Sequence, residues 1–120
     1  MPQGSTTLHE DPSKLRGETV DRHRAIVSLM EELEAVDWYD QRVDATGDEE
    51  LRRILEHNRD EEKEHAALLL EWLRRHDEKL AAELRSRLFR EGPIVTHEQE
   101  VETPAVSDGS LGIGSLKQGR

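Results

Sequence analysis

The chain has 120 residues, of which 33% are hydrophobic, 37% charged and 3% aromatic, and its net charge is −10. Such a polar chain builds at most one domain with a small core, so we expect it to need a partner surface. The negative charge argues against nucleic acid as a partner, and the absence of cysteine excludes disulfides, iron–sulfur clusters and thiolate zinc sites. Because no run is long and apolar enough for a membrane helix and residues 1–7 lack a secretion signal, we expect a cytoplasmic protein without membrane contact.

The first predicted helix runs from Asp11 to about Asp44, after a segment, residues 1–10, that we expect to be disordered. Asp11 and Pro12 are typical of a helix start, although Gly17 allows the first turns to fray. Apolar residues then recur at three- and four-residue steps, which places them on one face together with Glu32. The apolar members of this face are Leu15, Ala25, Ile26, Leu29, Met30, Leu33 and Val36.

A second helix is predicted over residues 49–75. Gly47 marks the clearest break in the pattern, and Asp48 is a suitable cap for the helix that follows. Because the connecting turn is short, the two helices are expected to lie side by side as an antiparallel hairpin.

A short third helix is predicted from Glu78 to about Phe89, with Asp77 as its cap and Gly92-Pro93 as its stop signal. Residues 11–93 would then form one helical hairpin domain. The polar and acidic residues 94–107 have the composition of a flexible linker.

The last segment, residues 108–120, places large aliphatic side chains among glycines and serines. It is too short to fold alone. It forms either a docking peptide, whose aliphatic side chains fill pockets on a partner, or a disordered end. The aliphatic residues are Leu111, Ile113 and Leu116.

Glu62 and His65 form a Glu-x-x-His pair on a face of the second helix that is otherwise apolar. A carboxylate among apolar side chains costs several kcal/mol unless it is compensated, and a metal ion held by both residues would compensate it. Glu32 has a similar place on the antiparallel helix. These three side chains predict a metal site whose carboxylate and imidazole ligands suit iron or manganese and also accept zinc.

The three residues supply half of a known kind of site. In ferritin-like di-iron proteins, two helices of a four-helix bundle each contribute a Glu, and the other two each contribute a Glu-x-x-His pair. The first and third predicted helices contain no second pair. A symmetric homodimer would complete the site at its interface and would cover the apolar faces of a lone hairpin. We therefore predict an all-α fold: a two-helix hairpin with a short third helix, dimerising into a ferritin-like four-helix bundle.

Other polar residues allow two interpretations. Glu31 and Glu34 either gather cations near the mouth of the site or belong to a solvated acidic face. Tyr39, two turns beyond Glu32, either hydrogen-bonds a metal ligand or is itself oxidised, or it packs as an ordinary amphipathic side chain. Another helix face carries either an outer cation site or plain surface charge, formed by His57, Glu61 and Glu64.

Several stretches of the chain resemble the encapsulated ferritin family, over roughly residues 18–93. They are ETVDRHRAIVS (18–28), MEELEAVDWYDQR (30–42), HNRDEEKEHAA (57–67) and EWLRR (71–75). The tail DGSLGIGSLK (108–117) resembles the targeting peptide that brings cargo into encapsulin nanocompartments. The two resemblances come from separate parts of the chain and agree.

The family resemblance implies a ferroxidase that oxidises Fe(II) to Fe(III) with dioxygen. Its di-iron centre would be formed by Glu32, Glu62 and His65 across a homodimer interface, with two iron ions at each interface. The resemblance also implies a secondary metal site on the route to this centre, formed by Glu31, Glu34 and Trp38. It places Tyr39 close to the di-iron centre.

The resemblance further implies how the protein assembles. Homodimers would form a ring-shaped homodecamer, and the C-terminal peptide would bind the encapsulin shell protein. Because an open ring encloses no cavity, iron mineral would be stored inside the shell. Two alternatives stay open: a peroxide-reducing di-iron protein, and a non-enzymatic metal-binding helical module.

Overall fold

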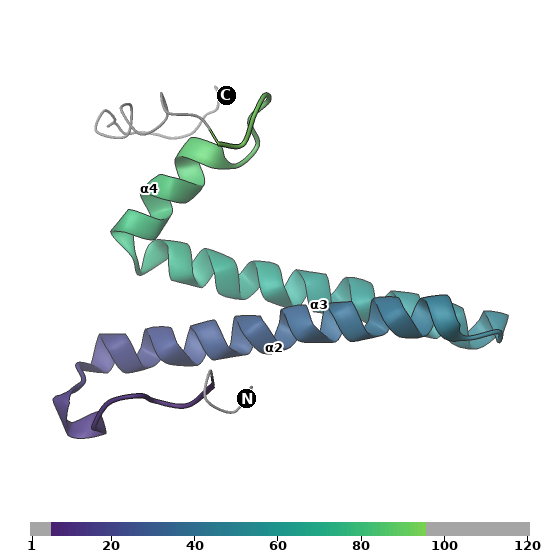
Figure 1. The fold of residues 1–120 in the computed structure, drawn as a ribbon, viewed down its shortest axis with the longest axis horizontal. Helices are drawn as coiled ribbons and strands as arrows, with labels where there is room; N and C mark the ends of the chain where they lie inside the picture. The colour runs from purple at the N-terminus through teal and green to yellow at the C-terminus, as the bar shows by residue number, and fades with distance from the viewer. Residues whose placement is uncertain (1–5, 96–120) are drawn as a thin grey trace. The chain divides into compact units, whose positions relative to one another are not determined.

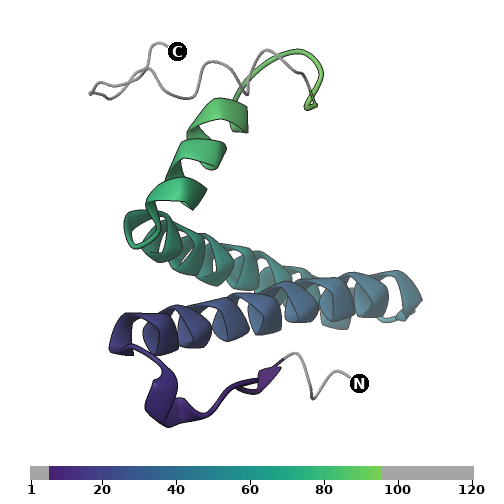
Figure 2. The ribbon, with the colours of Figure 1, turned by 60° about the vertical axis from the view of Figure 1, so that its left-hand side comes forward.

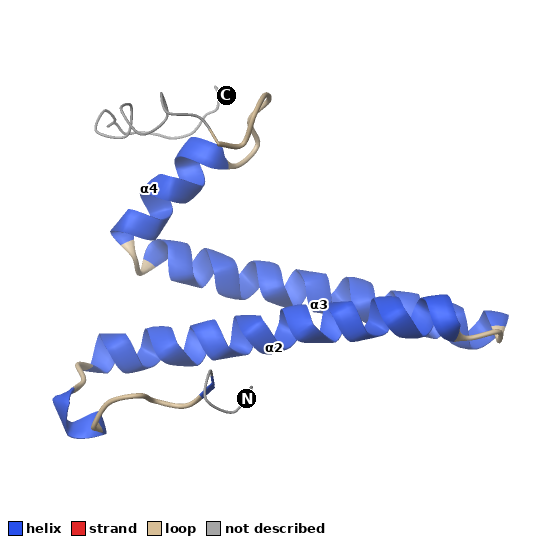
Figure 3. Cartoon of the chain, in the orientation of Figure 1, coloured by secondary structure: helices blue, strands red, loops and turns tan. Residues whose placement is uncertain are grey.

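A computed structural model of the chain describes residues 6–95. Within that range the chain is helical and contains no strand, which confirms the all-α prediction (Figure 3). None of the described helices combines the length and apolarity needed to cross a membrane. The elements are a short 3-10 helix, η1 (Pro12–Lys14), and the α-helices α2 (Gly17–Ala45), α3 (Glu49–Arg75) and α4 (Glu78–Arg87).

Several predicted segments fall outside the described residues. These are residues 1–5, the predicted linker from residue 96 on, and the whole targeting peptide with Leu111, Ile113 and Leu116. The described part of the chain divides after His76 into two compact units. The first holds α2 and α3, and the second holds α4.

α2 and α3 lie side by side and run in opposite directions, as Figures 1 and 2 show from two sides. Asp48 caps α3 by accepting a hydrogen bond from the backbone N–H of Leu51, at 2.9 Å. Arg52 donates to the carbonyl oxygens of Val43 (3.3 Å) and Thr46 (2.7 Å), at the end of α2 where carbonyls lack helical partners. These contacts close the predicted hairpin, and α3 has the predicted bounds.

The start of the first helix was predicted wrongly. Asp11 caps only the turn of η1, where it accepts a hydrogen bond from the N–H of Ser13 at 3.0 Å. The chain then becomes extended at Leu15 and Arg16, and α2 begins at Gly17. Gly17 has a low helix propensity, and Arg16 makes no side-chain hydrogen bond as a cap, so the helix does not extend back to Asp11.

The third helix begins as predicted and ends earlier. Asp77 caps α4 by accepting a hydrogen bond from the N–H of Leu80 at 3.0 Å. α4 stops at Arg87 because Leu88 is extended and Phe89 has a φ of 61°, in the left-handed region that ends a helix. The helix therefore stops two residues before Phe89, and the Gly92-Pro93 signal lies beyond it.

The hairpin of α2 and α3 buries few side chains. Ala25, Val43, Ala66 and Leu73 are its buried residues, and no polar or charged residue is buried among those described. This small core agrees with the polar composition. Large apolar side chains stay exposed on both helices: Ile26, Met30, Leu33 and Trp38 on α2, and Leu51, Ile54 and Leu68 on α3.

Candidate metal centre

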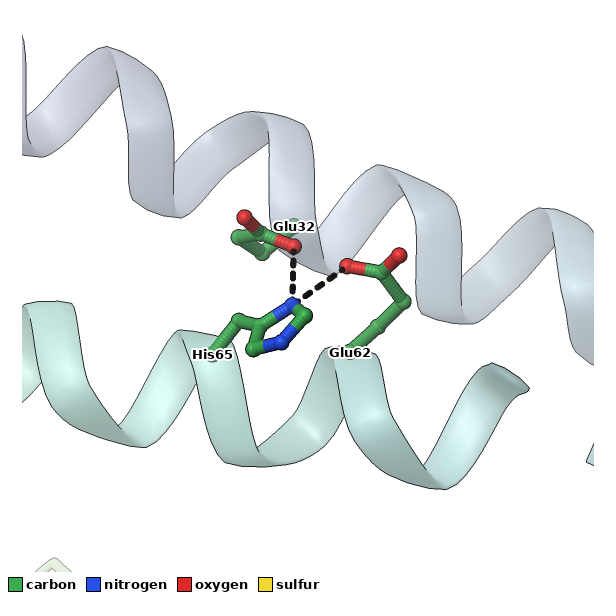
Figure 4. Close-up of side chains that lie close together, drawn as sticks. All are labelled: Glu32, Glu62 and His65. Carbon is green, nitrogen blue, oxygen red and sulfur yellow. Dashed lines mark hydrogen bonds and ion pairs between the residues drawn. The ribbon is translucent and has the colours of Figure 1, made fainter. Parts of the chain in front are cut away.

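Glu32 of α2 and the Glu62–His65 pair of α3 point toward one another between the two helices (Figure 4). His65 Nδ1 lies 3.3 Å from Glu62 Oε1 and 3.6 Å from Glu32 Oε1. Each residue offers one ligand atom, and the three atoms all lie within 4.8 Å of one another. Within residues 6–95, Glu32, Glu62 and His65 form the one group of at least three histidine or acidic residues that lie close enough to share an ion.

The sequence dictates this arrangement in two steps. Glu62 and His65 are three residues apart in a helix, which makes them neighbours on one face. The antiparallel hairpin then brings the middle of α2 to the middle of α3, so that Glu32 meets them from the other side. Glu32 thereby joins residues that lie 30 and 33 positions later in the chain in one cluster.

Electrostatics makes this cluster receptive to a cation. A side-chain hydrogen bond with Glu62 raises the pKa of Glu32, and burial and the negative charge of Glu62 act in the same direction. The same hydrogen bond lowers the pKa of Glu62, since this carboxylate accepts the proton that Glu32 holds. The hydrogen bond to Glu62 also raises the pKa of His65. The two carboxylates therefore compete for positive charge, which a proton, the imidazolium or a metal ion can provide.

The cluster is neither sealed nor fully solvated. The side chains of Glu32 and Glu62 are 26% and 24% exposed, and that of His65 is 47% exposed. The donor set consists of two carboxylates and one imidazole, which fits iron, manganese or zinc. One chain supplies three ligand atoms, so such an ion would keep positions open for a further ligand or a second chain.

The carboxylates of Glu31 and Glu34 are not part of this cluster. Glu31 and Glu34 are exposed on α2. Trp38 is exposed as well and lines an open hollow with Gln41, Arg42 and Ala45. Tyr39 is half-buried, and the guanidinium of Arg42 lies 5.5 Å from the centre of its ring.

The predicted outer cation site is only partly assembled. His57 Nε2 lies 3.3 Å from Glu61 Oε2, and both side chains are exposed. Glu64 is exposed too, and it does not join them within the distance that unites the central cluster. Among the described residues, this face therefore holds a contact between His57 and Glu61 rather than a three-ligand group.

Sequence reasoning missed an ion pair across the hairpin. Arg59 of α3 carries no motif that marks it in the sequence. Its Nη1 lies 3.1 Å from Oδ1 of Asp40 on α2, and its Nε lies 3.1 Å from Oδ1 of Asp60. No local signal in the sequence predicts this contact, because it joins two helices and depends on their register.

Known proteins show clear similarity to this chain. A sequence model of the EncFtn-like family matches residues 7–91. The Encapsulated ferritin-like protein of Rhodospirillum rubrum is 60% identical over 129 residues, which cover 98% of this chain and 92% of that protein. The Encapsulin nanocompartment cargo protein EncC of Myxococcus xanthus is 32% identical over 133 residues, which cover 98% of this chain and all of that protein (100%).

A solved structure supports the same relationship. The crystal structure of protein ne0167 from Nitrosomonas europaea matches with a TM-score of 0.71 and 58% sequence identity, over 74% of this chain and 98% of that chain. The resemblance to encapsulated ferritins is thus confirmed by sequence and by fold. The chain belongs to the EncFtn-like family.

Proposed function

We propose that the protein is a ferroxidase that binds Fe(II) as its substrate at Glu32, Glu62 and His65. Dioxygen accepts the electrons that iron loses on becoming Fe(III). The observation that carries the proposal is the convergence of two carboxylates and one imidazole from two helices, with all three ligand atoms within 4.8 Å. The ferritin-like names of the Rhodospirillum and Thermotoga relatives, the latter 52% identical over 109 residues, favour iron over the other ions that suit these ligands.

The protein side of the reaction is an exchange of positive charges. Without metal, contact with Glu62 raises the pKa of Glu32, and the Nδ1 atom of His65 faces both carboxylates. A cation that binds the cluster displaces any proton bound there and needs His65 unprotonated at its coordinating nitrogen. Because all three side chains are partly exposed, these protons can leave to solvent. The carboxylates then balance the greater positive charge of Fe(III).

We also propose that the complete centre is formed by two chains. One chain offers a single Glu and a single Glu-x-x-His pair, whereas a ferritin-like di-iron site needs two of each. The exposed apolar residues of α2 and α3, such as Leu33 and Ile54, give a second chain a surface to cover. Two iron ions would lie at the interface of the resulting homodimer, in a four-helix bundle.

The proposal extends to assembly and location. The names of two relatives, one encapsulated and one an encapsulin cargo protein, support a place inside an encapsulin nanocompartment. The peptide of residues 108–120 would bind the shell, and the dimers would form the ring-shaped homodecamer that the family resemblance implies. Fe(III) released by the ring would be stored as mineral within the shell. We assign the secondary metal site to Glu31, Glu34 and Trp38. Tyr39 would be a neighbour of the di-iron centre.

The test is to add Fe(II) to the assembled protein without oxygen and then admit air. We expect a rise in ferric absorbance with the wild-type chain. Glu62→Ala and His65→Ala should lose most of this activity while circular dichroism shows unchanged helix content. Glu64→Ala is the matched control, because Glu64 lies between these residues on α3 but outside the cluster. A Glu62→Ala variant with the full rate would disprove the proposal, and faster oxidation by hydrogen peroxide than by dioxygen would favour the peroxide-reducing alternative.

A further inference from the structure

The metal cluster depends on how α2 and α3 are aligned along their length. Glu32 comes from α2, whereas Glu62 and His65 come from α3, and the gap between Glu32 Oε1 and His65 Nδ1 is 3.6 Å. A slide of one helix by one residue moves side chains by about 1.5 Å, and a slide by one turn moves them by about 5.4 Å. Displacements of that size would separate Glu32 from its partners.

The apolar packing of the hairpin fixes this alignment only weakly. Two of its four buried side chains, Ala25 and Ala66, are alanines, and no described side chain is less than 2% exposed. Large side chains that interlock with holes on a facing helix set the register of helix pairs, and short alanine side chains do this poorly. Polar contacts must therefore contribute to the alignment.

Few polar contacts between α2 and α3 are available for that task. In the described part of the chain, the ion pairs that join the two helices are Glu32–His65, which belongs to the cluster, and Asp40–Arg59. Besides these and the contact of Glu32 with Glu62 inside the cluster, the cross-hairpin hydrogen bonds lie at its ends, where Arg52 and Arg22 donate to backbone carbonyl oxygens. Asp40–Arg59 is thus the ion pair between the two helices that lies beside the cluster. Arg59 precedes Glu62 by about one turn of α3.

The guanidinium of Arg59 is held from two sides. Nη1 bonds to Asp40 and Nε bonds to Asp60, each at 3.1 Å. The Arg59 side chain is only 22% exposed, whereas those of Asp40 and Asp60 are 53% and 62% exposed. A planar guanidinium bonded to two carboxylates loses freedom, so it can hold Asp40, and with it α2, at one position along α3.

We infer that Asp40 and Arg59 are a positioning pair, which sets the register at which Glu32 meets Glu62 and His65. This role rests on the proposed function of that cluster. The hydrogen bonds and ion pairs of Asp40 and Arg59 in the described chain do not include the metal ligands, so the pair acts through the alignment of the helices. Removal of either residue should therefore change metal binding without removing a ligand.

The test compares Co(II) binding by Arg59→Gln, Asp40→Asn and the double variant, in the full chain without oxygen. Loss of residues that orient metal ligands weakens affinity by about 10–100-fold, and we expect the lower end, about tenfold, because the pair acts indirectly. The visible spectrum of bound Co(II) should also change, since it reports ligand geometry. The double variant should bind no more weakly than either single variant, because both remove the same contact.

Arg52→Gln is the matched control. It removes hydrogen bonds at the turn, ten residues before Glu62 along α3, so it should lower the melting temperature and leave Co(II) affinity and spectrum unchanged. Wild-type affinity and spectrum in Arg59→Gln, or equal losses in Arg52→Gln, would overturn the inference.

A second readout needs no metal. The chain has no cysteine, so Arg24→Cys and Arg53→Cys can carry spin labels on exposed positions of α2 and α3. Arg24 precedes Glu32 by eight residues, and Arg53 precedes its cross-hairpin partner His65 by twelve. With labelled chains diluted in unlabelled ones, the labels should therefore lie roughly 30 Å apart along the hairpin, from about 20 residues of helical rise. Arg59→Gln should shift or broaden this distance, and an unchanged distribution would overturn the inference. If the wild-type chain binds no Co(II) or Fe(II), the proposed function fails, while the label distance still decides whether the pair sets the register.

Discussion

Replacing Glu32 by Gln should stabilise the metal-free protein while it weakens metal binding. The ligand oxygens of Glu32 and Glu62 lie within 4.8 Å of each other. Two negative charges at that distance repel by about 0.9 kcal/mol in water and by about 3.5 kcal/mol at an effective dielectric constant of about 20. Both side chains are about one-quarter exposed, which places the repulsion between these limits, near 2 kcal/mol. The lost ion pair with His65 subtracts less than about 1 kcal/mol, so we expect a net gain of about 1 kcal/mol.

The assay is unfolding at pH 8 in the presence of a chelator, with all variants at one protein concentration because dimer formation would make stability depend on concentration. A gain of 1 kcal/mol corresponds to a rise in Tm of about 4–8 °C for a domain of this size. Glu31→Gln is the control, since it removes the same charge from an exposed position one residue away. If Glu32→Gln is no more stable than Glu31→Gln, the two carboxylates do not repel as the geometry requires.

Three further predictions address stability and targeting. Hydrogen bonds from Arg74, and to a lesser extent from Arg75, lower the pKa of Glu71 to about 2. The ionised form of Glu71 therefore stabilises the fold above about pH 4.5, and this contribution is lost as the pH falls through about 2. Chemical unfolding should therefore find the wild type more stable than Glu71→Gln at pH 6 and equal to it near pH 2; a constant difference would contradict this. Arg52→Ala should lower the free energy of unfolding by about 1–2 kcal/mol because two carbonyl oxygens lose a charged donor, whereas the exposed Arg53→Ala should change it little. Deletion of residues 108–120 should prevent loading into a co-expressed encapsulin shell without slowing iron oxidation, and normal loading would refute the targeting role.

The sequence predicted features that depend on local signals. The cap at Asp48 and the short turn before it defined α3 and the hairpin, and both were found as expected. The Asp11-Pro12 signal shows the limit of such reasoning. It does cap a helical turn, but η1 has only three residues, and local signals do not state how far a helix continues.

The cluster itself was predictable because charged side chains on an apolar helix face are conspicuous. Glu32, Glu62 and His65 each stood out in this way, and the antiparallel arrangement places them at the same position along the hairpin. Asp40 and Arg59 did not stand out, since charged residues are common in this chain and 19 positions separate the two. Their contact depends on the register of two helices, which has no local signal. The opposite pKa shifts of Glu32 and Glu62 likewise depend on a distance across the hairpin.

The most direct test of the metal centre is X-ray diffraction at the iron absorption edge, from crystals loaded with Fe(II) without oxygen. We expect anomalous density beside Glu32, Glu62 and His65, with the same residues of a second chain completing the coordination. Anomalous density elsewhere, for example beside His57 and Glu61, with none at the cluster, would contradict the assignment.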